Sequence, residues 1–476
     1  MNDPTIAKPN LTVLTKAQIQ QVHEYALQIL STVGVRVDSE RACDLFARAA
    51  TPAAVEGNRV RIPRELIEWA IQTAPSSVHV YNRSGEPAFQ LPGPARFGIG
   101  VTALYYQDPE TDQVTPFTRQ HMASLVRLGH VLPSYDLIST VGIVQDVPTH
   151  LSDLYATLEM AANTTKPLVI LVSDETAFPA VLDLLEHLHG DLASRPFVVP
   201  YLNPITPLVI NRGTIDKMWA SAERGLPYIY SNYGMSGASA PITPGGTLAL
   251  LTAELLAGLT LSQLIREGSP VILGNLPAFF DMKGMGSFYD PQSYLVNLCC
   301  AEMMDHYRLP HAGTSGSGVG WGADLLASGH QWMNHLLTCI GKVGLAPFVG
   351  DNLDSKAFSP AIVVYANEII VQARMFAGGF SLDEAHVAVD QMAEVGPGGN
   401  YLMSDLTLAR FRSAYYKSGI FPLLTMEEWQ ARGCPPAEGL LRKHTRKLLD
   451  SAQPPADHDD LLARGEAFIQ TYERRG

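Results

Sequence analysis

Residues 311–322 combine five glycines with one large aromatic side chain, Trp321. Glycine adopts backbone angles that other residues avoid, so this run predicts a loop that can lie very close to a ligand. A short apolar segment precedes the run and a helix-like segment follows it. In proteins built from alternating strands and helices, loops in this position carry catalytic and binding groups. The run is therefore the first candidate for a functional site.

Polar residues follow six of the eight short apolar runs of the chain, and they are the second candidate. They are Asp174, Asn203, Asn232 with Tyr233, Asn275, Thr314 with Ser315, and Asp351 with Asn352. If the runs are parallel strands, their carboxyl ends meet at one mouth, and these side chains form a polar pocket there. Each of them is also a common turn or cap residue, and that alternative stays open for any single position.

Aromatic residues gather near the same predicted mouth. They are Tyr105, Tyr106, Tyr233, Phe279, Phe280, Tyr289, Trp321 and Phe358. Aromatic rings can enclose a quaternary ammonium group through cation–π attraction. We expect some of these rings to pack in the core and the others to line the pocket.

The elements that position these residues follow a regular rhythm. The apolar runs begin 30 to 43 residues apart, and helix-like sequence fills most of the gaps between them. They are residues 95–100, 135–141, 167–172, 197–202, 227–230, 270–273, 308–312 and 346–349. Such alternation predicts parallel strands joined by helical crossovers, and eight units are what a (β/α)8 barrel requires. A doubly wound open sheet is the alternative fold.

Helical sequence flanks the predicted barrel on both sides. A capping-box pattern begins at Thr15, and apolar residues then recur on one helical face until Gly34. We therefore predict an α/β chain with an N-terminal helical cap over residues 1–94, a (β/α)8 TIM barrel over residues 95–382 and a C-terminal helical extension over residues 383–476.

Composition narrows the partners. The chain has 476 residues and a formal net charge of −13, which argues against nucleic acid or an anionic membrane as its main partner. The most apolar window, residues 246–265, includes Glu254 and several hydroxyl side chains, so we expect a buried helix rather than a membrane span. The five cysteines are scattered without a C-x-x-C spacing, which favours reduced thiols, a cytoplasmic location and no structural zinc.

Motifs for other chemistries are incomplete. Residues 98–100 and 316–320 are rich in glycine but lack the spacing of a dinucleotide-binding loop, and there is no Walker A sequence. Residues 313–318 match Gly-x-Ser-x-Gly without the strand–turn–helix frame of a hydrolase. Four histidines are expected to be core or helix-surface residues rather than metal ligands: His306, His311, His330 and His335.

Ten segments, in their order and spacing, resemble the trimethylamine methyltransferase family over almost the whole chain. They include Met235-Ser-Gly-Ala-Ser-Ala-Pro-Ile-Thr243 and Val395-Gly-Pro-Gly-Gly399. The others are residues 29–37, 61–67, 161–166, 203–208, 253–258, 281–284, 305–310 and 367–370. The resemblance implies a (β/α)8 barrel, in agreement with the rhythm of the apolar runs.

The resemblance also implies an activity. Members of the family move a methyl group from a methylated amine to the cobalt of a corrinoid (cobalamin) that a separate protein carries. This chain has no Asp-x-His-x-x-Gly corrinoid-binding signature, so the family pattern implies a cognate corrinoid protein as partner and no metal bound by the chain itself. A homo-oligomer is a further expectation from the family.

One position departs from the trimethylamine enzymes, in which pyrrolysine follows an Ala-Gly-Ser stretch. Here residues 312–314 match that stretch and Ser315 stands at the position of pyrrolysine. A serine offers no electrophilic imine to activate a free tertiary amine. A quaternary ammonium group already carries its charge and leaves as a neutral amine, so its transfer needs mainly orientation. We therefore expect a quaternary-amine (betaine-type) methyltransferase without pyrrolysine, similar to the glycine betaine enzymes of the family.

The candidate site has Ser315 as its catalytic position and a larger substrate-binding set. That set is Tyr105, Tyr106, Asn203, Tyr233, Asn275, Trp321, Asp351, Asn352, Lys356 and Phe358. Within it, Asn203, Asn352 or Lys356 would hold a carboxylate of the substrate. Two alternatives remain at this stage. The first is another methyl donor, such as a sulfonium compound, or methyl transfer linked to folate. The second is a barrel that binds a betaine or a corrinoid without catalysis.

Overall fold

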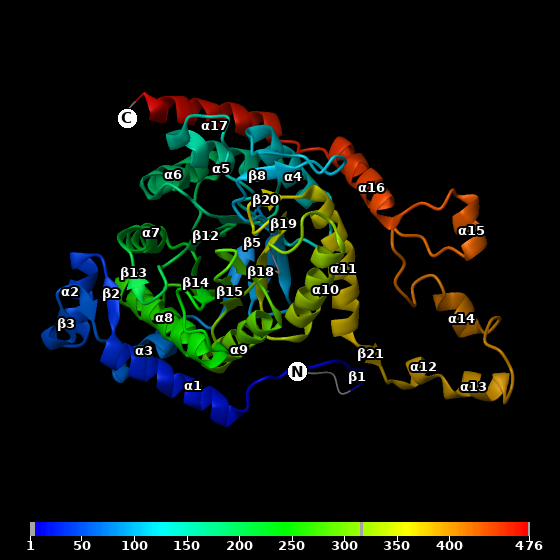
Figure 1. The fold of residues 1–476 in the computed structure, drawn as a ribbon, viewed down its shortest axis with the longest axis horizontal. Coiled ribbons are helices and arrows are strands. Elements are labelled where there is room, and N and C mark those ends of the chain that lie inside the picture. Colours follow the sequence, from blue (N-terminus) through cyan, green and yellow to red (C-terminus); the bar gives the residue numbers. More distant parts are fainter. Residues whose placement is uncertain (1–4, 315–317, 475–476) are drawn as a thin grey trace.

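The computed structural model describes residues 5–314 and 318–474, and its centre is a closed barrel of eight parallel strands (Figure 1). The strands are β7 (Arg96–Ile99), β10 (Leu137–Ser139), β11 (Leu168–Ile170), β12 (Val198–Leu202), β14 (Tyr228–Ser236), β15 (Val271–Asp281), β17 (His311–Ala312) and β18 (Leu345–Val349). Pairing of β18 with β7 closes the ring. Each strand coincides with one predicted apolar run, so the (β/α)8 barrel is confirmed and the open sheet is wrong.

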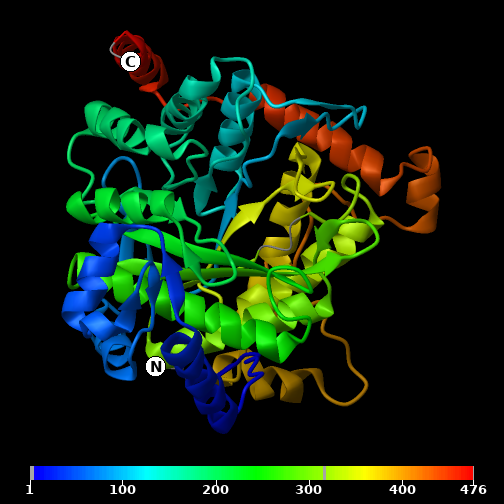
Figure 2. The ribbon, with the colours of Figure 1, turned by 60° about the vertical axis from the view of Figure 1, so that its left-hand side comes forward.

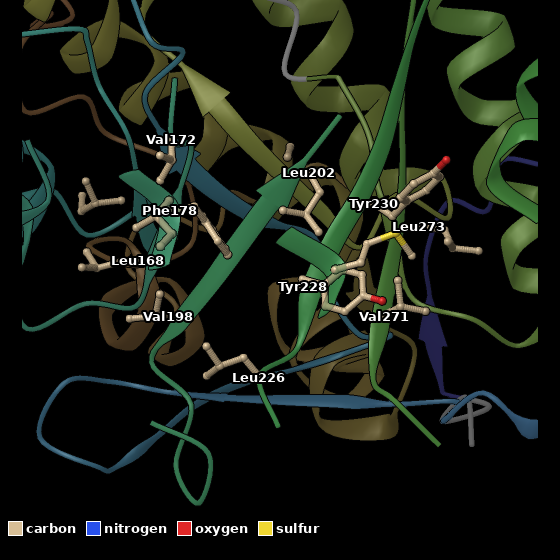
Figure 3. Close-up of a cluster of buried hydrophobic side chains, with 14 of the residues drawn as sticks. Leu168, Val172, Phe178, Val198, Leu202, Leu226, Tyr228, Tyr230, Val271 and Leu273 are labelled. Carbon is tan, nitrogen blue, oxygen red and sulfur yellow. The ribbon is translucent and has the colours of Figure 1, made fainter. Parts of the chain in front are cut away.

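A ring of helices surrounds the barrel (Figure 2). They are α4 (Arg119–Val131), α5 (Ser152–Asn163), α6 (Phe178–His189), α7 (Arg212–Glu223), α8 (Pro244–Ile265), α9 (Pro291–Tyr307), α10 (Leu325–Ile340) and α11 (Pro360–Gly378). Alternate residues of each strand face this ring, because successive side chains of a strand point to opposite sides. Figure 3 shows part of the resulting core, where Leu202, Tyr230 and Leu273 are fully or almost fully buried.

Helix α8 is apolar around its whole circumference because it is covered on both sides. The barrel lies on one side, and three helices of the N-terminal segment pack on the other: α1 (Lys16–Gln28), α2 (Glu40–Ala49) and α3 (Arg64–Thr73). Among the described residues, α8 alone is long and apolar enough to cross a membrane, but 89% of that window is buried inside the fold. The expectation of a buried helix at residues 246–265 is confirmed.

The N-terminal segment contains strands as well as the predicted helices. Strand β2 (Val35–Val37) pairs with β4 (Arg59–Val60) and also with β13 (Val209–Ile210), which lies in the loop between β12 and α7. This small sheet therefore ties the N-terminal segment to the barrel.

A hairpin closes the amino end of the barrel. It consists of β5 (Val78–Tyr81) and β6 (Pro87–Leu91), paired antiparallel. Its side chains Val78, Val80, Phe89 and Leu91 share one buried cluster with residues near the start of the barrel strands: Leu137, Val169, Val199, Ile229, Ile272 and Leu345. The interior is therefore a packed core at this end, and only the carboxyl end is open to a ligand.

The C-terminal segment has two unlike parts. Helices α16 (Ala437–Ser451) and α17 (His458–Glu473) pack on the outside of the barrel, against α11 with α4 and against α5 with α6. Before them, residues 382–436 form an arm that extends from the barrel in Figure 1 and contacts α11 again at residues 416–421, where Tyr416 and Ser418 donate to Glu368. Its helices contain no buried residue among those described: α12 (Glu384–Val387), α13 (Val389–Val395), α14 (Asp405–Arg410) and α15 (Met426–Ala431).

Candidate functional site

Two small sheets rise above the carboxyl end of the barrel. On one side, β14 and β15 continue past the barrel as parallel neighbours, and β15 turns back into β16 (Gly286–Phe288). On the other side, β19 (Asp351–Asn352) and β20 (Ala357–Phe358) pair with each other and join β8 (Tyr105–Gln107) and β9 (Val114–Pro116). The loops of both sheets meet at the glycine-rich run, as expected for the functional end of a barrel.

A pocket of about 560 Å³ lies where these loops meet. Its walls come from four separate segments of the chain. They are residues 287–289 after the β15–β16 turn, residues 318–321 of the glycine-rich run, Leu326 and His330 of α10, and the turn of residues 353–355.

Four tyrosines and one carboxylate gather at this mouth. The rings of Tyr289 and Tyr294 are stacked, with centroids 6.4 Å apart and planes 6° apart. Burial raises the pKa of Tyr289 well above its usual value. Its neighbours raise this pKa further, so they lie within electrostatic reach of its hydroxyl: Tyr233, Asp351, Tyr294 and Tyr201. We refer to these four tyrosines and Asp351 as the tyrosine cluster.

Asp351 is the charged member of the tyrosine cluster and is only 2% exposed. It directly follows β18, so the barrel itself places it at the mouth. Tyr201 comes from the interior of the barrel, where its ring meets that of Phe348 edge-on at 4.9 Å. Burial of the tyrosines raises their pKa values, so their hydroxyls stay neutral near pH 7.

Polar contacts fix the outer wall of the pocket. The hydroxyl of Tyr294 lies 2.9 Å from Nδ1 of His330, and burial lowers the pKa of this histidine, which keeps it neutral. Ser287 donates from Oγ to Oδ1 of Asp354 at 3.3 Å. Nζ of Lys356 lies 3.3 Å from Oδ2 of the same aspartate. The only lysine at this wall among the described residues is therefore already paired.

The glycine-rich run is held against the turn of residues 353–355 by backbone hydrogen bonds. The amides of Leu353 and Asp354 donate to the carbonyls of Gly320 and Gly318 at 3.0 and 3.1 Å. The turn has three consecutive left-handed residues, with φ of 50°, 60° and 59°. Because left-handed residues other than glycine cost roughly 1–2 kcal/mol each, the surrounding contacts must stabilise this turn.

Glycine is required at one position of the run in particular. Gly320 has a φ of +99°, and a Cβ atom there would lie 2.8 Å from Cβ of Ala327 and 2.9 Å from Oδ1 of Asp324. Asp324 is the N-cap of α10, since its carboxylate accepts from the amide of Ala327. The close approach of loop and helix thus depends on the missing side chain.

Asn352 anchors the glycine-rich run instead of facing the pocket. Its side-chain amide lies 2.5 Å from Oε1 of Gln107, and Nε2 of Gln107 donates to the carbonyl of Trp321 at 2.8 Å. The Trp321 side chain itself is 73% exposed and lies at the rim. Gln107 was not among the predicted residues, because a glutamine within a short strand carries no sequence signal for such a role.

The structure places the other predicted residues in two groups. Tyr233, Asp351 and Lys356 lie beside residues that line the pocket, whereas three other side chains do not. Tyr106 stacks on His121 with ring centroids 4.1 Å apart, and Phe358 is fully buried beneath Gly350. Asn275 faces the helix side of the barrel, where its Oδ1 lies 2.5 Å from Nε2 of His311.

The remaining predicted residues are peripheral or lie outside the described part. Asn203 is exposed and donates from Nδ2 to the carbonyl of Ser231 at 3.2 Å. Tyr105 is 39% exposed on β8. Ser315, the predicted catalytic position, lies outside the described residues. Tyr201, Tyr294, His330 and Asp354 belong to the mouth but were not among the predicted site residues.

No group of three or more His, Cys, Asp or Glu residues in ranges 5–314 and 318–474 could hold a metal ion. The titratable residues of the mouth are carboxylates, phenols, one neutral histidine and Lys356, which is paired with Asp354. This arrangement is suited to an organic cation, because ring faces and a carboxylate both attract positive charge.

Comparison with known proteins yields one family. The family model described as trimethylamine methyltransferase (MTTB) matches residues 2–476. The trimethylamine methyltransferase MttB of Desulfitobacterium hafniense (strain DSM 10664 / DCB-2) is 27% identical over 464 residues, which are 96% of this chain and 93% of that protein. The glycine betaine methyltransferase of Desulfitobacterium hafniense (strain Y51) is 26% identical over 474 residues, which are 97% of each chain.

A solved structure has the same fold. The monomethylamine methyltransferase MtmB of Methanosarcina barkeri superposes with a TM-score of 0.52 over 93% of this chain and 89% of that chain. Sequence identity is 10%, so this likeness concerns the fold alone.

Proposed function

The chain belongs to the trimethylamine methyltransferase family, and we propose that it transfers a methyl group from a quaternary ammonium compound to the cobalt of a corrinoid carried by a separate protein. The observation that carries this proposal is the tyrosine cluster, in which Tyr233, Tyr294, Tyr201 and the buried Asp351 all lie within electrostatic reach of Tyr289, a residue of the pocket wall. The two relatives named for trimethylamine and for glycine betaine support methyl transfer from an amine.

The tyrosine cluster favours a substrate with a permanent positive charge. Each ring face contributes on the order of 0.5–2 kcal/mol to holding a cation, and the contribution grows as water is excluded. The carboxyl group of Asp351 adds an attraction in its ionised form, which a bound cation nearby favours. A tertiary amine gains these contributions only in its protonated form.

The site must support the transfer of a methyl group without the electron pair that bonded it to nitrogen. The bond between nitrogen and the methyl carbon breaks, the electron pair stays on nitrogen, and a neutral tertiary amine leaves. The cobalt(I) of a corrinoid supplies the electron pair that accepts the methyl group. No proton moves in this step, so the residues of the pocket have to bind, orient and desolvate the substrate.

Serine at position 315 supports the choice of a quaternary donor. It offers no electrophile for capturing a tertiary amine, and a quaternary amine needs none. The proposed enzyme therefore works without pyrrolysine.

The rim of the mouth supports the docking of a second protein. Exposed apolar side chains surround it: Trp321 at 73%, Leu325 at 91%, Met282 at 72% and Met285 at 71%. Apolar groups that gather on a surface in this way mark sites where another protein binds. A corrinoid carried by such a partner would approach the pocket from the open, carboxyl end of the barrel.

The direct test combines the purified chain with a corrinoid protein reduced to cobalt(I) and a panel of methyl donors. We expect corrinoid methylation and release of the tertiary amine with quaternary ammonium donors, and no reaction with trimethylamine. Absorbance of the corrinoid and mass spectrometry of the amine measure the two products. The proposal is wrong if no quaternary donor reacts while a sulfonium donor or trimethylamine does.

A further inference from the structure

The pocket is richer in negative charge than a binding site for a zwitterion should be. Asp354 lines the pocket, Asp351 belongs to the tyrosine cluster, and Asp290 is the N-cap of α9, the helix that carries Tyr294. Lys356 is the one cationic side chain in contact with these groups among the described residues, and it pairs with Asp354. The three residues of the loop that lie outside the described part are serine, glycine and serine, which are uncharged by type.

The side chains that could receive a carboxylate are engaged elsewhere. Asn352 binds Gln107 and so fixes the glycine-rich run. Lys356 lies 3.3 Å from Asp354, and its side chain is 63% exposed to water. Asn203 donates to the carbonyl of Ser231. Each of the three residues that the sequence suggested for this role therefore has another partner or points to solvent.

The geometry points to a substrate class within the proposed function. We propose that the pocket selects quaternary ammonium compounds whose remaining substituent carries no carboxylate, and that it discriminates against betaines. This inference rests on the proposed methyl transfer and concerns only the fourth substituent on nitrogen. In a betaine, the carboxylate is held a few bonds from the ammonium group, so it would enter the field of Asp351 and Asp354 together with the cation. A hydroxyl or a methyl group in its place meets no such repulsion.

Binding measurements test this without the corrinoid partner. Calorimetric titration of the purified chain compares choline, glycine betaine and 3,3-dimethylbutan-1-ol, which is the uncharged carbon analogue of choline. We expect choline to bind at least about tenfold more tightly than either of the other two. Equal or tighter binding of glycine betaine would overturn the inference, and the backbone amides of the glycine-rich run would then be the carboxylate site.

Two variants that change the charge of the pocket in opposite directions test the inference further. Asp354→Asn removes a negative charge at a left-handed position that asparagine tolerates, and Lys356→Met removes the positive charge beside it. We expect Asp354→Asn to lower the ratio of choline affinity to betaine affinity several-fold, and Lys356→Met to raise this ratio. Glu384→Gln on the arm makes the same charge change as the first variant far from the pocket, and it should leave the ratio unchanged. If both pocket variants leave the ratio unchanged, charge does not set the specificity.

Measurements of methyl-transfer activity distinguish a failure of this inference from a failure of the proposed function. Methyl transfer from glycine betaine at a kcat/KM equal to or above that from choline or tetramethylammonium contradicts the specificity but retains the function. No transfer from any quaternary donor contradicts the function itself.

Discussion

The two ends of the barrel use the same strands for opposite purposes. At the amino end, the β5–β6 hairpin places Val78, Val80, Phe89 and Leu91 against apolar side chains, and the interior is a packed core. At the carboxyl end, the strands continue into phenols, carboxylates and a turn with three left-handed residues. Apolar burial stabilises the fold at one end, whereas the other end holds groups that cost stability and bind a ligand.

The largest effect should come from opening the closed end. Phe89→Ala removes a buried ring from the hairpin and should lower the free energy of unfolding by roughly 3–5 kcal/mol, because the lost contacts and the new cavity add. Chemical denaturation measures the change, and Phe380→Ala is the control because Phe380 is 66% exposed. Turnover per folded molecule should be unchanged. A loss of turnover at full stability would mean that the two ends are not separate.

At the open end we expect the opposite result, a loss of activity with little change in stability. Asp351→Asn removes the buried carboxyl group that would pair with the bound cation, and it should lower kcat/KM for a quaternary donor about 100-fold, as for loss of one member of a buried charge pair. The melting temperature should change little or rise. Asp405→Asn, at the exposed start of α14, is the matched control. A large fall in stability with an unchanged kcat/KM would assign Asp351 to the fold.

A second buried carboxylate lies behind the barrel wall and tests the comparison through pH. Glu254 accepts from Oγ1 of Thr206, the amide of Leu208 and Nδ2 of Asn232, yet burial raises its pKa from 4.5 to about 7. The folded state therefore holds a proton that the unfolded state has released, and stability falls as pH rises from about 4.5 to 7, by roughly 2–3 kcal/mol.

Glu254→Gln should remove this fall, since glutamine does not titrate. Denaturation at several pH values in that window compares the two proteins. The same pH slope in both would contradict the raised pKa of Glu254.

The smallest effect concerns a single ring of the tyrosine cluster. Tyr289→Leu should raise KM for a quaternary donor about three- to thirty-fold with little change in kcat, because one cation–π contact is lost. Tyr289→Phe keeps the ring face and should behave almost as the original enzyme. Equal effects of both substitutions would show that the hydroxyl matters rather than the ring.

The comparison also explains how far the sequence could be interpreted. All eight strands were predictable, because buried parallel strands are short apolar runs and the helices between them set their spacing. Tyr233 and Asp351, which lie beside the pocket, were singled out because each follows a predicted apolar run. The same argument failed for Asn275, because alternate residues on a strand face opposite sides and the sequence does not indicate which side is inside.

Other residues at the barrel mouth do not follow an apolar run, so no sequence pattern identifies them. Tyr201 lies within its strand rather than after it, and Tyr294 belongs to the first turn of α9. Their approach to Asp351 depends on how far the β15–β16 hairpin rises above the barrel, which depends on pairings between distant segments. The fold therefore follows from local patterns, and the site follows from tertiary contacts.

The arm of residues 382–436 is a site where a protease could cut the chain without disrupting the architecture of the protein. Its helices bury nothing, so sites such as Arg412 and Arg432 are open to trypsin, whereas α16 and α17 bury Leu441, Leu461 and Ile469 against the helices of the barrel. A single cut would produce two polypeptides that remain one particle. On a denaturing gel the protein would look broken, while in a sizing column the two fragments would elute together.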